Sequence, residues 1–416
     1  MSKFVEGATP WKTDLYYTSP WNYDESVKSM YHFSDNIKFH DVTLRDGEQQ
    51  NGVMFTMEEK IALAEKMSEI GIHRIEAGMA AVSKHDEAAI REICKRNLGP
   101  EIWTFARCMK ADVDLVKDLG CDGACMEIPS NELIIRNAYK WEPQKAIENA
   151  IIATNYAHEQ GLHINLFCLD SARSDWSFLT WFIDSILKDG YADSIACVDT
   201  TGALSPMGSY ALVRALKERY PDKPIEFHAH DDFSCGSANT VMALAAGAEV
   251  AHTSVAGIGE RAGNVSFEEV AVQLLTCYGV DTGIQYNKLY DLARFCLDTA
   301  GVSCKPNQPI YGKAISNHET GLGVGWRENL RKEGKSMLIL GSYLNALTGH
   351  PDGAYCLGKH SGTPTVNYFL EKFGYQNVEK NDVIKILMEV KETGYQKHGL
   401  LTDDEFKKIA DEVLGK

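Results

Sequence analysis

The sequence lacks the features that mark membrane, secreted or nucleic-acid-binding proteins. None of its apolar runs is long enough to cross a bilayer, and the N-terminus has no apolar core of the kind that a signal peptide needs. The 11 cysteines form no CxxC pair, and acidic residues outnumber basic ones to give a net charge of −16. We therefore predict a cytoplasmic protein with reduced thiols that binds neither nucleic acid nor membrane.

The chain also lacks repeats and low-complexity tracts, and its 44% hydrophobic and 24% charged residues are typical of a soluble globular protein. Short apolar runs alternate with longer amphipathic stretches. Near-continuous apolar character is typical of strands that are buried on both faces, and we predict eight such strands. They span residues 37–44, 74–80, 102–108, 123–129, 163–170, 194–200, 225–231 and 250–257.

The stretches between these strands carry helix start and stop signals. Residues 56–71 open with a capping box of Thr56 and Glu59 and stop at Gly71. Residues 142–161 and 205–222 follow the same pattern. The chain is therefore predicted to alternate strand and helix.

Alternation of this kind, eight times over roughly 250 residues, predicts an α/β fold of the (β/α)8 TIM barrel type. A doubly wound open sheet is the alternative, but it carries a glycine-rich phosphate loop after its first strand, and the RDGEQQNG segment (residues 45–52) is not such a loop. We predict an N-terminal arm over residues 1–36, the barrel over 37–284 and a smaller, mainly helical C-terminal region over 285–416.

Polar side chains gather where the predicted strands end, which is where TIM barrels carry their chemistry. His228 and His230 lie two residues apart on one strand, so their side chains point to the same face. The other polar residues at these ends are Arg45, Asp46, Glu76, Asp199, Thr200 and Asn264.

Two imidazoles, one carboxylate and one amide oxygen, from His228, His230, Asp46 and Asn264, form a mixed nitrogen and oxygen set without thiolate. Such a set suits Mn²⁺, Mg²⁺ or Fe²⁺, and Zn²⁺ is also chemically permissible. The following Asp231 or Asp232 would then be a hydrogen-bond acceptor that fixes an imidazole tautomer. The alternative is that each histidine is an ordinary core residue with satisfied hydrogen bonds. Two histidines on one face with Asp46 available favour the metal.

Several motifs together resemble one known group of enzymes. They are TLRDGEQ (43–49), HAHDD (228–232), GSANTVMALAAGA (236–248), GIGERAGN (257–264) and LGKHSG (357–362). The chain resembles the DRE-TIM metallolyases, which include the 2-isopropylmalate, homocitrate, citramalate and Re-type citrate synthases and the 3-hydroxy-3-methylglutaryl-CoA lyases. The likeness is strongest from about residue 37 to 280.

The resemblance implies a metal-dependent Claisen condensation of acetyl-CoA with a 2-oxo acid, which yields a 2-hydroxy di- or tricarboxylic acid and free CoA. In the family's pattern Asp46, His228, His230 and Asn264 match the metal ligands. Arg45 matches the arginine that stabilises the enolate or the developing alkoxide. The resemblance also implies that Thr200 holds the substrate carboxylate. Glu76, a catalytic candidate, and Gln49, a substrate-binding candidate, would lie in the same pocket. It further implies a homodimer.

The chain departs from the synthases at two positions. Leu169 stands where the synthases usually carry a glutamate, and Gly323 replaces the second histidine of their HxSGIH motif. The acid and base groups are therefore open, and we take His318 and Tyr343 as catalytic candidates. The additional candidates are Glu319, His350 and Asp170.

Substrate preference is indicated only weakly. Homocitrate synthases place an arginine after the fourth strand for the distal carboxylate, and Arg136 lies two positions from that place. This slightly favours a dicarboxylic oxo acid such as oxaloacetate.

Two other functions stay open. A lyase that cleaves a carbon–carbon bond is the first alternative, but the superfamily lyase has a cysteine in a GCPYA loop where this chain has GERAGN. A non-catalytic paralogue is the second, because Leu169 and Gly323 depart from the synthases. Polar groups that are costly to bury argue against it.

Overall fold

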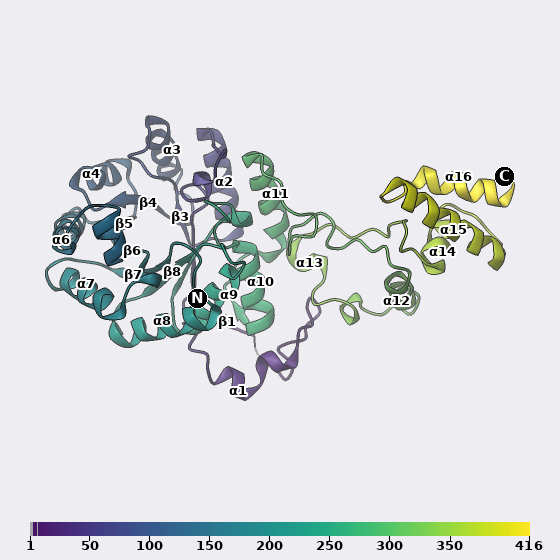
Figure 1. Ribbon diagram of the computed structural model, residues 1–416, viewed down its shortest axis with the longest axis horizontal. Coiled ribbons are helices and arrows are strands. Elements are labelled where there is room, and N and C mark those ends of the chain that lie inside the picture. Colours follow the sequence, from purple (N-terminus) through teal and green to yellow (C-terminus); the bar gives the residue numbers. More distant parts are fainter. Residues whose placement is uncertain (1–2, 6) are drawn as a thin grey trace. The chain divides into compact units, whose positions relative to one another are not determined.

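The computed structural model describes residues 3–5 and 7–416, and eight parallel strands of it close into a barrel (Figure 1). All eight predicted strands are confirmed, and with them the TIM barrel. They are β2 (Lys38–Asp41), β3 (Arg74–Glu76), β4 (Glu101–Arg107), β5 (Gly123–Pro129), β6 (His163–Leu169), β7 (Ser194–Asp199), β8 (Ile225–Ala229) and β9 (Val250–Thr253). The barrel closes between β2 and β9, where Lys38 pairs with Val250 and Asp41 with Thr253.

Several strands end earlier than predicted because their last residues form turns. After β2 the carbonyl of Val42 accepts the amides of Arg45, Asp46 and Gly47, which folds the chain tightly at the strand end. β8 likewise ends at Ala229, and His230 forms an isolated bridge with Asn264. These turns hold the polar residues at the C-terminal ends of the strands.

Helices surround the strands, as Figure 1 shows. Helix α2 (Met57–Ile70) confirms its predicted signals, because Thr56 and Glu59 form a capping box and Gly71 adopts the left-handed conformation at φ +93°. The helices that follow the other strands are α3 (Lys84–Lys95), α4 (Lys110–Leu119), α5 (Glu132–Asn137), α6 (Pro143–Glu159), α7 (Trp176–Asp189), α8 (Pro206–Arg219), α9 (Gly236–Ala245) and α10 (Phe267–Tyr278).

The N-terminal segment packs on the barrel. The short strand β1 (Lys3–Phe4) pairs antiparallel with β10 (Val280–Asp281), and a single helical turn, α1 (Glu25–Lys28), follows. The hydroxyls of Thr18 and Tyr23 donate to the carbonyl of Thr276 at the end of α10.

The chain forms two compact units. The first comprises the residues up to Trp11 together with Thr18–Cys304, and it includes α11 (Leu289–Ala300). The second comprises Lys12–Tyr17 and Lys305–Lys416. Its helices are α12 (Gly321–Lys332), α13 (Asn345–Thr348), α14 (Thr363–Lys372), α15 (Lys380–Lys397) and α16 (Asp403–Leu414). The domain limits drawn from the sequence stay a prediction.

The second unit has its own apolar core, in which Val366, Phe369, Ile386, Val390 and Phe406 are buried. Among the residues described, no helix is both long enough and apolar enough to span a membrane.

The inside of the barrel is more polar than the apolar strands predict. Arg74, Glu76, Glu226, His40 and His252 are all buried there. Arg74 donates to both oxygens of Glu226 at 3.0 Å, and His252 contacts the same carboxylate at 2.8 Å. The expectation of near-continuous apolar strands is therefore wrong for the inward-facing positions, where charges are buried in pairs.

Candidate metal centre and active site

Asp46, His228 and His230 form a buried triad at the mouth of the barrel. One possible ligand atom from each lies within 4.8 Å of the others. The Nε2 atoms of His228 and His230 lie 3.4 and 3.9 Å from Asp46 Oδ2. Strand periodicity turns both imidazoles inward, and the turn after β2 brings the carboxylate to them across the closed barrel.

Asn264 joins the triad from the loop after β9. Its side-chain amide donates to Asp46 Oδ1 and to the carbonyl of Ile258, both at 3.1 Å. Glycine in this loop is required where Gly263 adopts φ +97°, because a Cβ there would collide with the carbonyl oxygen of Gly257. The GIGERAGN motif thus gives the loop the tight fold that carries Asn264 inward.

The ionisation of the triad suits a cation. Burial alone would raise the pKa of Asp46, but Arg45 and the two imidazoles hold that pKa well below its usual range. Burial lowers the pKa of His228, and it lowers the pKa of His230 to about 4. One carboxylate and two neutral imidazoles are the forms in which these side chains bind metals.

The same group also holds polar atoms without partners. Among the residues that the structure describes, Nδ1 of His228, Nδ1 of His230 and Oδ1 of Asn264 are buried and make no hydrogen bond. Asp231 and Asp232 do not supply the acceptor suggested by the sequence, because Asp231 accepts the Gly236 amide at 2.6 Å and Asp232 pairs with Arg261. An unpaired buried acceptor is costly, so the free Oδ1 of Asn264, whose amide contacts Asp46, suits an ion at this place. The two unpaired Nδ1 atoms lie on the other side of their rings from the Nε2 atoms that face Asp46.

Arg45 is fixed beside the triad by two carboxylates and one ring. Its Nη1 donates to Asp46 at 2.7 Å, its Nε forms a short contact with Glu76, and its guanidinium lies 4.1 Å from the centre of the Phe105 ring. Its Nη2 is buried without a partner among the described residues. One donor group of an otherwise immobile guanidinium is therefore free for a substrate oxygen.

Glu76 anchors Arg45. One of its oxygens accepts from Arg45 and the other lies 3.0 Å from His40 Nε2. Burial would raise the pKa of Glu76, but Arg45 and His40 lower it to about 2. This carboxylate stays ionised and has no free oxygen, so its position suits holding Arg45 rather than taking a proton.

The sequence reasoning missed the buried layer below Glu76. His40 stacks on His252 with ring centres 4.4 Å apart, and Arg74 lies 3.9 Å from the Trp103 ring. The sequence did carry a signal for this layer, because ionisable residues such as His40, Arg74 and Glu226 interrupt the apolar strands. It points to inward-facing polar residues by the same two-residue periodicity that identified His228.

The other predicted site residues lie in varied places. Thr200 accepts the Asp170 amide at 3.0 Å through its hydroxyl, just after β7, and Gln49 is exposed in the turn after β2. Arg136 is exposed on α5 and pairs with Glu132 at 2.9 Å and with Glu142. The structure does not bring Arg136 into contact with the triad.

His318 and Tyr343 lie in the second compact unit. The backbone of His318 forms an isolated β-bridge with Tyr355, and the backbone of Tyr343 forms one with Tyr16. Burial and the positive charge of Arg327 lower the pKa of His318. Their catalytic roles stay predictions.

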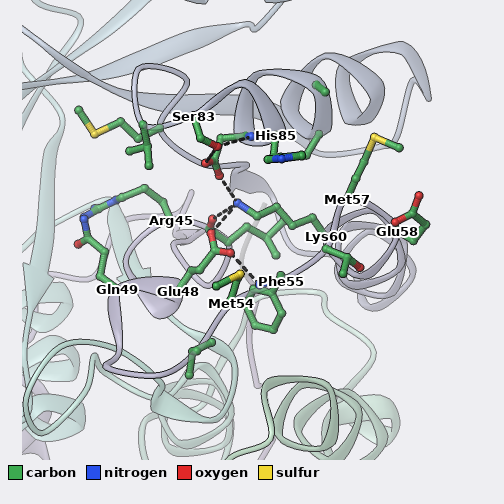
Figure 2. A pocket seen from close by; sticks show the side chains of 18 residues that line it. Arg45, Glu48, Gln49, Met54, Phe55, Met57, Glu58, Lys60, Ser83 and His85 are labelled. Carbon is green, nitrogen blue, oxygen red and sulfur yellow. Dashed lines mark hydrogen bonds and ion pairs between the residues drawn. The ribbon is translucent and has the colours of Figure 1, made fainter.

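A pocket of about 850 Å³ opens beside Arg45, between the turn after β2 and helices α2 and α3 (Figure 2). Its wall mixes apolar side chains such as Met54 and Phe55 with polar ones. The buried Lys60 amine lies 2.6 Å from both Glu48 and Asp86. A dashed line in Figure 2 marks the ion pair of Lys60 with Glu48. Arg45 and Gln49, from the turn after β2, also line this pocket.

A family model described as HMGL-like matches residues 36–296, which include every member of the triad and Asn264. The chain belongs to the HMGL-like family. Its match covers the whole barrel and confirms the resemblance to the DRE-TIM metallolyases.

Curated relatives of this HMGL-like chain are synthases. It is 34% identical over 400 residues to homocitrate synthase AksA of Methanothermobacter thermautotrophicus, covering 96% of this chain and 98% of that one. It is 35% identical over 382 residues to (R)-citramalate synthase CimA of Methanocaldococcus jannaschii, covering 91% and 75%. Among solved structures, the HMG-CoA lyase of Bacillus subtilis matches with a TM-score of 0.58 and 21% identity over 65% of this chain and 95% of that one. That likeness shows the barrel fold.

Members of this family depend on a divalent metal, and the residues of this chain fit one. The unpartnered Oδ1 of Asn264 and the nitrogen and oxygen donor set of the triad agree with that requirement. Asp46, His228 and His230, with Asn264, are therefore the residues that would hold the ion.

Proposed function

We propose that this HMGL-like enzyme condenses acetyl-CoA with a 2-oxo acid and releases CoA and a 2-hydroxy di- or tricarboxylic acid. The acyltransferase type is supported by the synthases among its relatives. The observation that carries the proposal is the buried triad of Asp46, His228 and His230 with the free Nη2 of Arg45 beside it. This pairing places a cation site next to a fixed donor for an oxyanion.

The triad would orient the 2-oxo acid. A divalent ion such as Mn²⁺ or Mg²⁺, with Zn²⁺ or Fe²⁺ as alternatives, would polarise the ketone as a Lewis acid when bound. Asp46, His228, His230 and Asn264 would hold that ion, and Thr200 is proposed to hold the substrate carboxylate. The aromatic rings of Phe105 and Phe167 line this side of the barrel, 5.2 Å apart, and would keep bulk water away.

Arg45 would stabilise the negative charge that develops during the reaction. Its Nε and Nη1 are held by Glu76 and Asp46, so its Nη2 is presented without the cost of ordering a mobile side chain. The oxygen of an acyl enolate, or the alkoxide that forms on the ketone, is the matching ligand. The pocket beside Arg45 is the proposed place of the acyl-CoA arm, with Gln49 on its wall.

A dicarboxylic oxo acid such as oxaloacetate is the proposed substrate class. Arg136 is its candidate group, and that side chain pairs with two glutamates. It would have to exchange those partners for the distal carboxylate of a substrate. Substrate choice therefore needs a screen.

The test is the release of free CoA thiol from acetyl-CoA with Mn²⁺ or Mg²⁺, in the presence of oxaloacetate, 2-oxoglutarate, pyruvate or 2-oxoisovalerate. We expect release with one of these acids and its loss when a chelator is added. No release with any of them would overturn the condensation. Cleavage of 3-hydroxyacyl-CoA esters by the same preparation would then identify a lyase.

A further inference from the structure

The proposed condensation, on which this inference rests, needs a base that removes a proton from the methyl carbon of acetyl-CoA. A base needs a free lone pair and a pKa that is not depressed. Several carboxyl groups lie at or just after the C-terminal ends of strands in the barrel unit. Asp41 ends β2 next to the inward-facing His40, so its side chain points to the outer face of the barrel. Asp231 and Asp232, after β8, are held by the Gly236 amide and by Arg261. The remaining candidates are Asp46, Glu76, Glu127, Asp170 and Asp199.

Asp46 and Glu76 are unsuited as bases because both carboxylates already pair with Arg45. Both pKa values are lowered, although burial raises them, because Arg45 lies beside both carboxylates and imidazoles contact them. Both oxygens of Glu76 accept hydrogen bonds.

Asp170 and Asp199 form hydrogen bonds within the loops that follow their own strands. The two oxygens of Asp170 accept from Arg173 at 2.8 and 3.0 Å. The two oxygens of Asp199 accept the amides of Ala203 and Leu204 at 2.8 and 2.9 Å. Neither carboxylate keeps an oxygen free of such a partner.

Glu127 is different. It lies on β5, in register with Arg107 of β4 and Phe167 of β6. Cys125, two residues before it, belongs to the inner apolar cluster with Phe167, so Glu127 also faces the inside of the barrel. The hydroxyl of Tyr139 donates to its Oε1 at 2.8 Å. Within the described part of the chain, the Tyr139 bond to Oε1 is the one hydrogen bond of this carboxylate, which leaves Oε2 available.

The surroundings of Glu127 strengthen it as a base. Burial raises its pKa, and the Tyr139 hydrogen bond and the positive charges of Arg45 and Arg107 offset only part of that rise. Arg107 is itself held by Asp112 at 2.8 Å. Burial and the nearby Glu127 charge also raise the pKa of the Cys108 thiol, so this neighbour stays protonated. From β6 the facing side chain is the apolar Phe167.

We propose that Glu127 is the general base of the condensation and that Tyr139 positions it. Oε2 takes a proton from the methyl carbon, and the C–H electron pair becomes the enolate, whose oxygen is stabilised by Arg45. The enolate carbon forms a bond to the ketone carbon, and the ketone oxygen gains a proton from water. Hydrolysis of the thioester then releases CoA, and Glu127 returns its proton to solvent.

The test compares Glu127→Gln, which keeps size and removes the base, with Glu127→Asp, which keeps the carboxyl. Glu127→Gln is expected to lower kcat by about 10²- to 10⁴-fold, as the loss of a general base does. Its KM for the oxo acid should stay within about threefold of wild type, because the metal and carboxylate contacts remain. Glu127→Asp should retain an intermediate rate. With trideuterated acetyl-CoA the isotope effect on kcat should rise in Glu127→Gln.

Two further variants control the test. Glu148→Gln removes the same charge from an exposed position on α6, and its kcat should stay within about twofold of wild type. Tyr139→Phe removes the donor that lowers the pKa of Glu127, so the acid limb of the kcat/KM profile should move to higher pH. This variant carries the test if Glu127→Gln fails to fold.

The outcomes separate the two proposals. If wild type releases no CoA with any oxo acid, the proposed function fails, and the role of Glu127 with it. If wild type turns over while Glu127→Gln keeps its kcat within about threefold, only the assignment of the base is wrong. An unmoved acid limb in Tyr139→Phe would also overturn it.

Discussion

Each side chain of the triad has a distinct partner, and this allows the metal assignment to be tested residue by residue. His230→Ala and Asp46→Ala should each lower metal-dependent turnover by at least about 100-fold, more than the loss of a group that only supports a ligand. The barrel should still fold, because neither side chain belongs to its apolar core. Turnover and far-ultraviolet circular dichroism, measured on the same samples, check both statements.

His163→Ala is the matched control, because His163 lies at the opposite end of its strand and its side chain is 67% exposed. Its turnover should be unchanged. Full activity in either His230→Ala or Asp46→Ala would contradict the assignment of the site.

The sequence predicted which residues form the triad, but it did not predict which nitrogen of Arg45 lacks a hydrogen-bond partner. His228 and His230 follow from strand periodicity alone, and Asp46 follows from barrel closure. That Glu76 and Asp46 leave Nη2 free depends on side-chain geometry, which the sequence does not contain. The orientation of the Asn264 side chain likewise depends on geometry that the sequence does not contain.

At the scale of elements, the loop after β9 is the one whose backbone is most constrained. Gly263→Ala should lower the free energy of unfolding by about 1–3 kcal/mol and reduce turnover, because φ +97° is strained for alanine and the new Cβ meets a carbonyl. Asn264 would move with the loop. Chemical denaturation and the CoA assay measure the two effects.

Gly120→Ala controls for the left-handed backbone alone, because Gly120 has φ +83° and a Cβ added there would meet no atom within 4 Å. It should cost stability without lowering turnover. Equal losses of turnover in both variants would contradict a specific role for the Gly263 loop.

The buried layer of β2, β3, β8 and β9 makes stability depend on pH. Burial lowers the pKa of His252 to about 4 in the folded barrel, against 6.5 for an unperturbed histidine. Between these values the unfolded chain binds a proton that the folded chain does not, so stability falls as pH decreases. The loss is on the order of 3 kcal/mol across this window. Urea unfolding at pH 7 and pH 4 should show it.

His252→Gln removes this titration, so its stability should change less between the two pH values. His163→Gln, an exposed histidine, should keep the wild-type pH dependence. An unchanged dependence in His252→Gln would show that His252 is not the group responsible.

The elements were predictable to different degrees for a physical reason. The eight strands follow from their local apolar runs. The caps of α2 follow from Thr56, Glu59 and Gly71. The pairing of Arg74 with Glu226 joins residues 152 positions apart, and only the register of the closed barrel brings them together. Long-range pairs of this kind leave little trace in one sequence.

On the scale of the whole molecule, large apolar side chains are exposed on the loops and first helical turns that follow seven successive strands. They are Met54, Val82, Met109, Leu133, Trp176, Met207 and Phe233. Because these segments all follow the C-terminal ends of strands, the side chains surround the mouth of the barrel. Exposed apolar groups at this density are typical of surfaces that bind another protein.

We expect a second copy of the chain to cover this surface outside the pocket that Met54 and Val82 line, as the resemblance to dimeric synthases implies. Light scattering after size exclusion should give twice the chain mass of 46.2 kDa. The double variant Leu133→Ser and Phe233→Ser should shift the protein toward monomer, because these side chains are 71% and 73% exposed and lose apolar area on association. Ile384→Ser and Met388→Ser, exposed on α15, form the control pair. A wild-type monomer at micromolar concentration would contradict the dimer, and dissociation by the control pair alone would move the interface to α15.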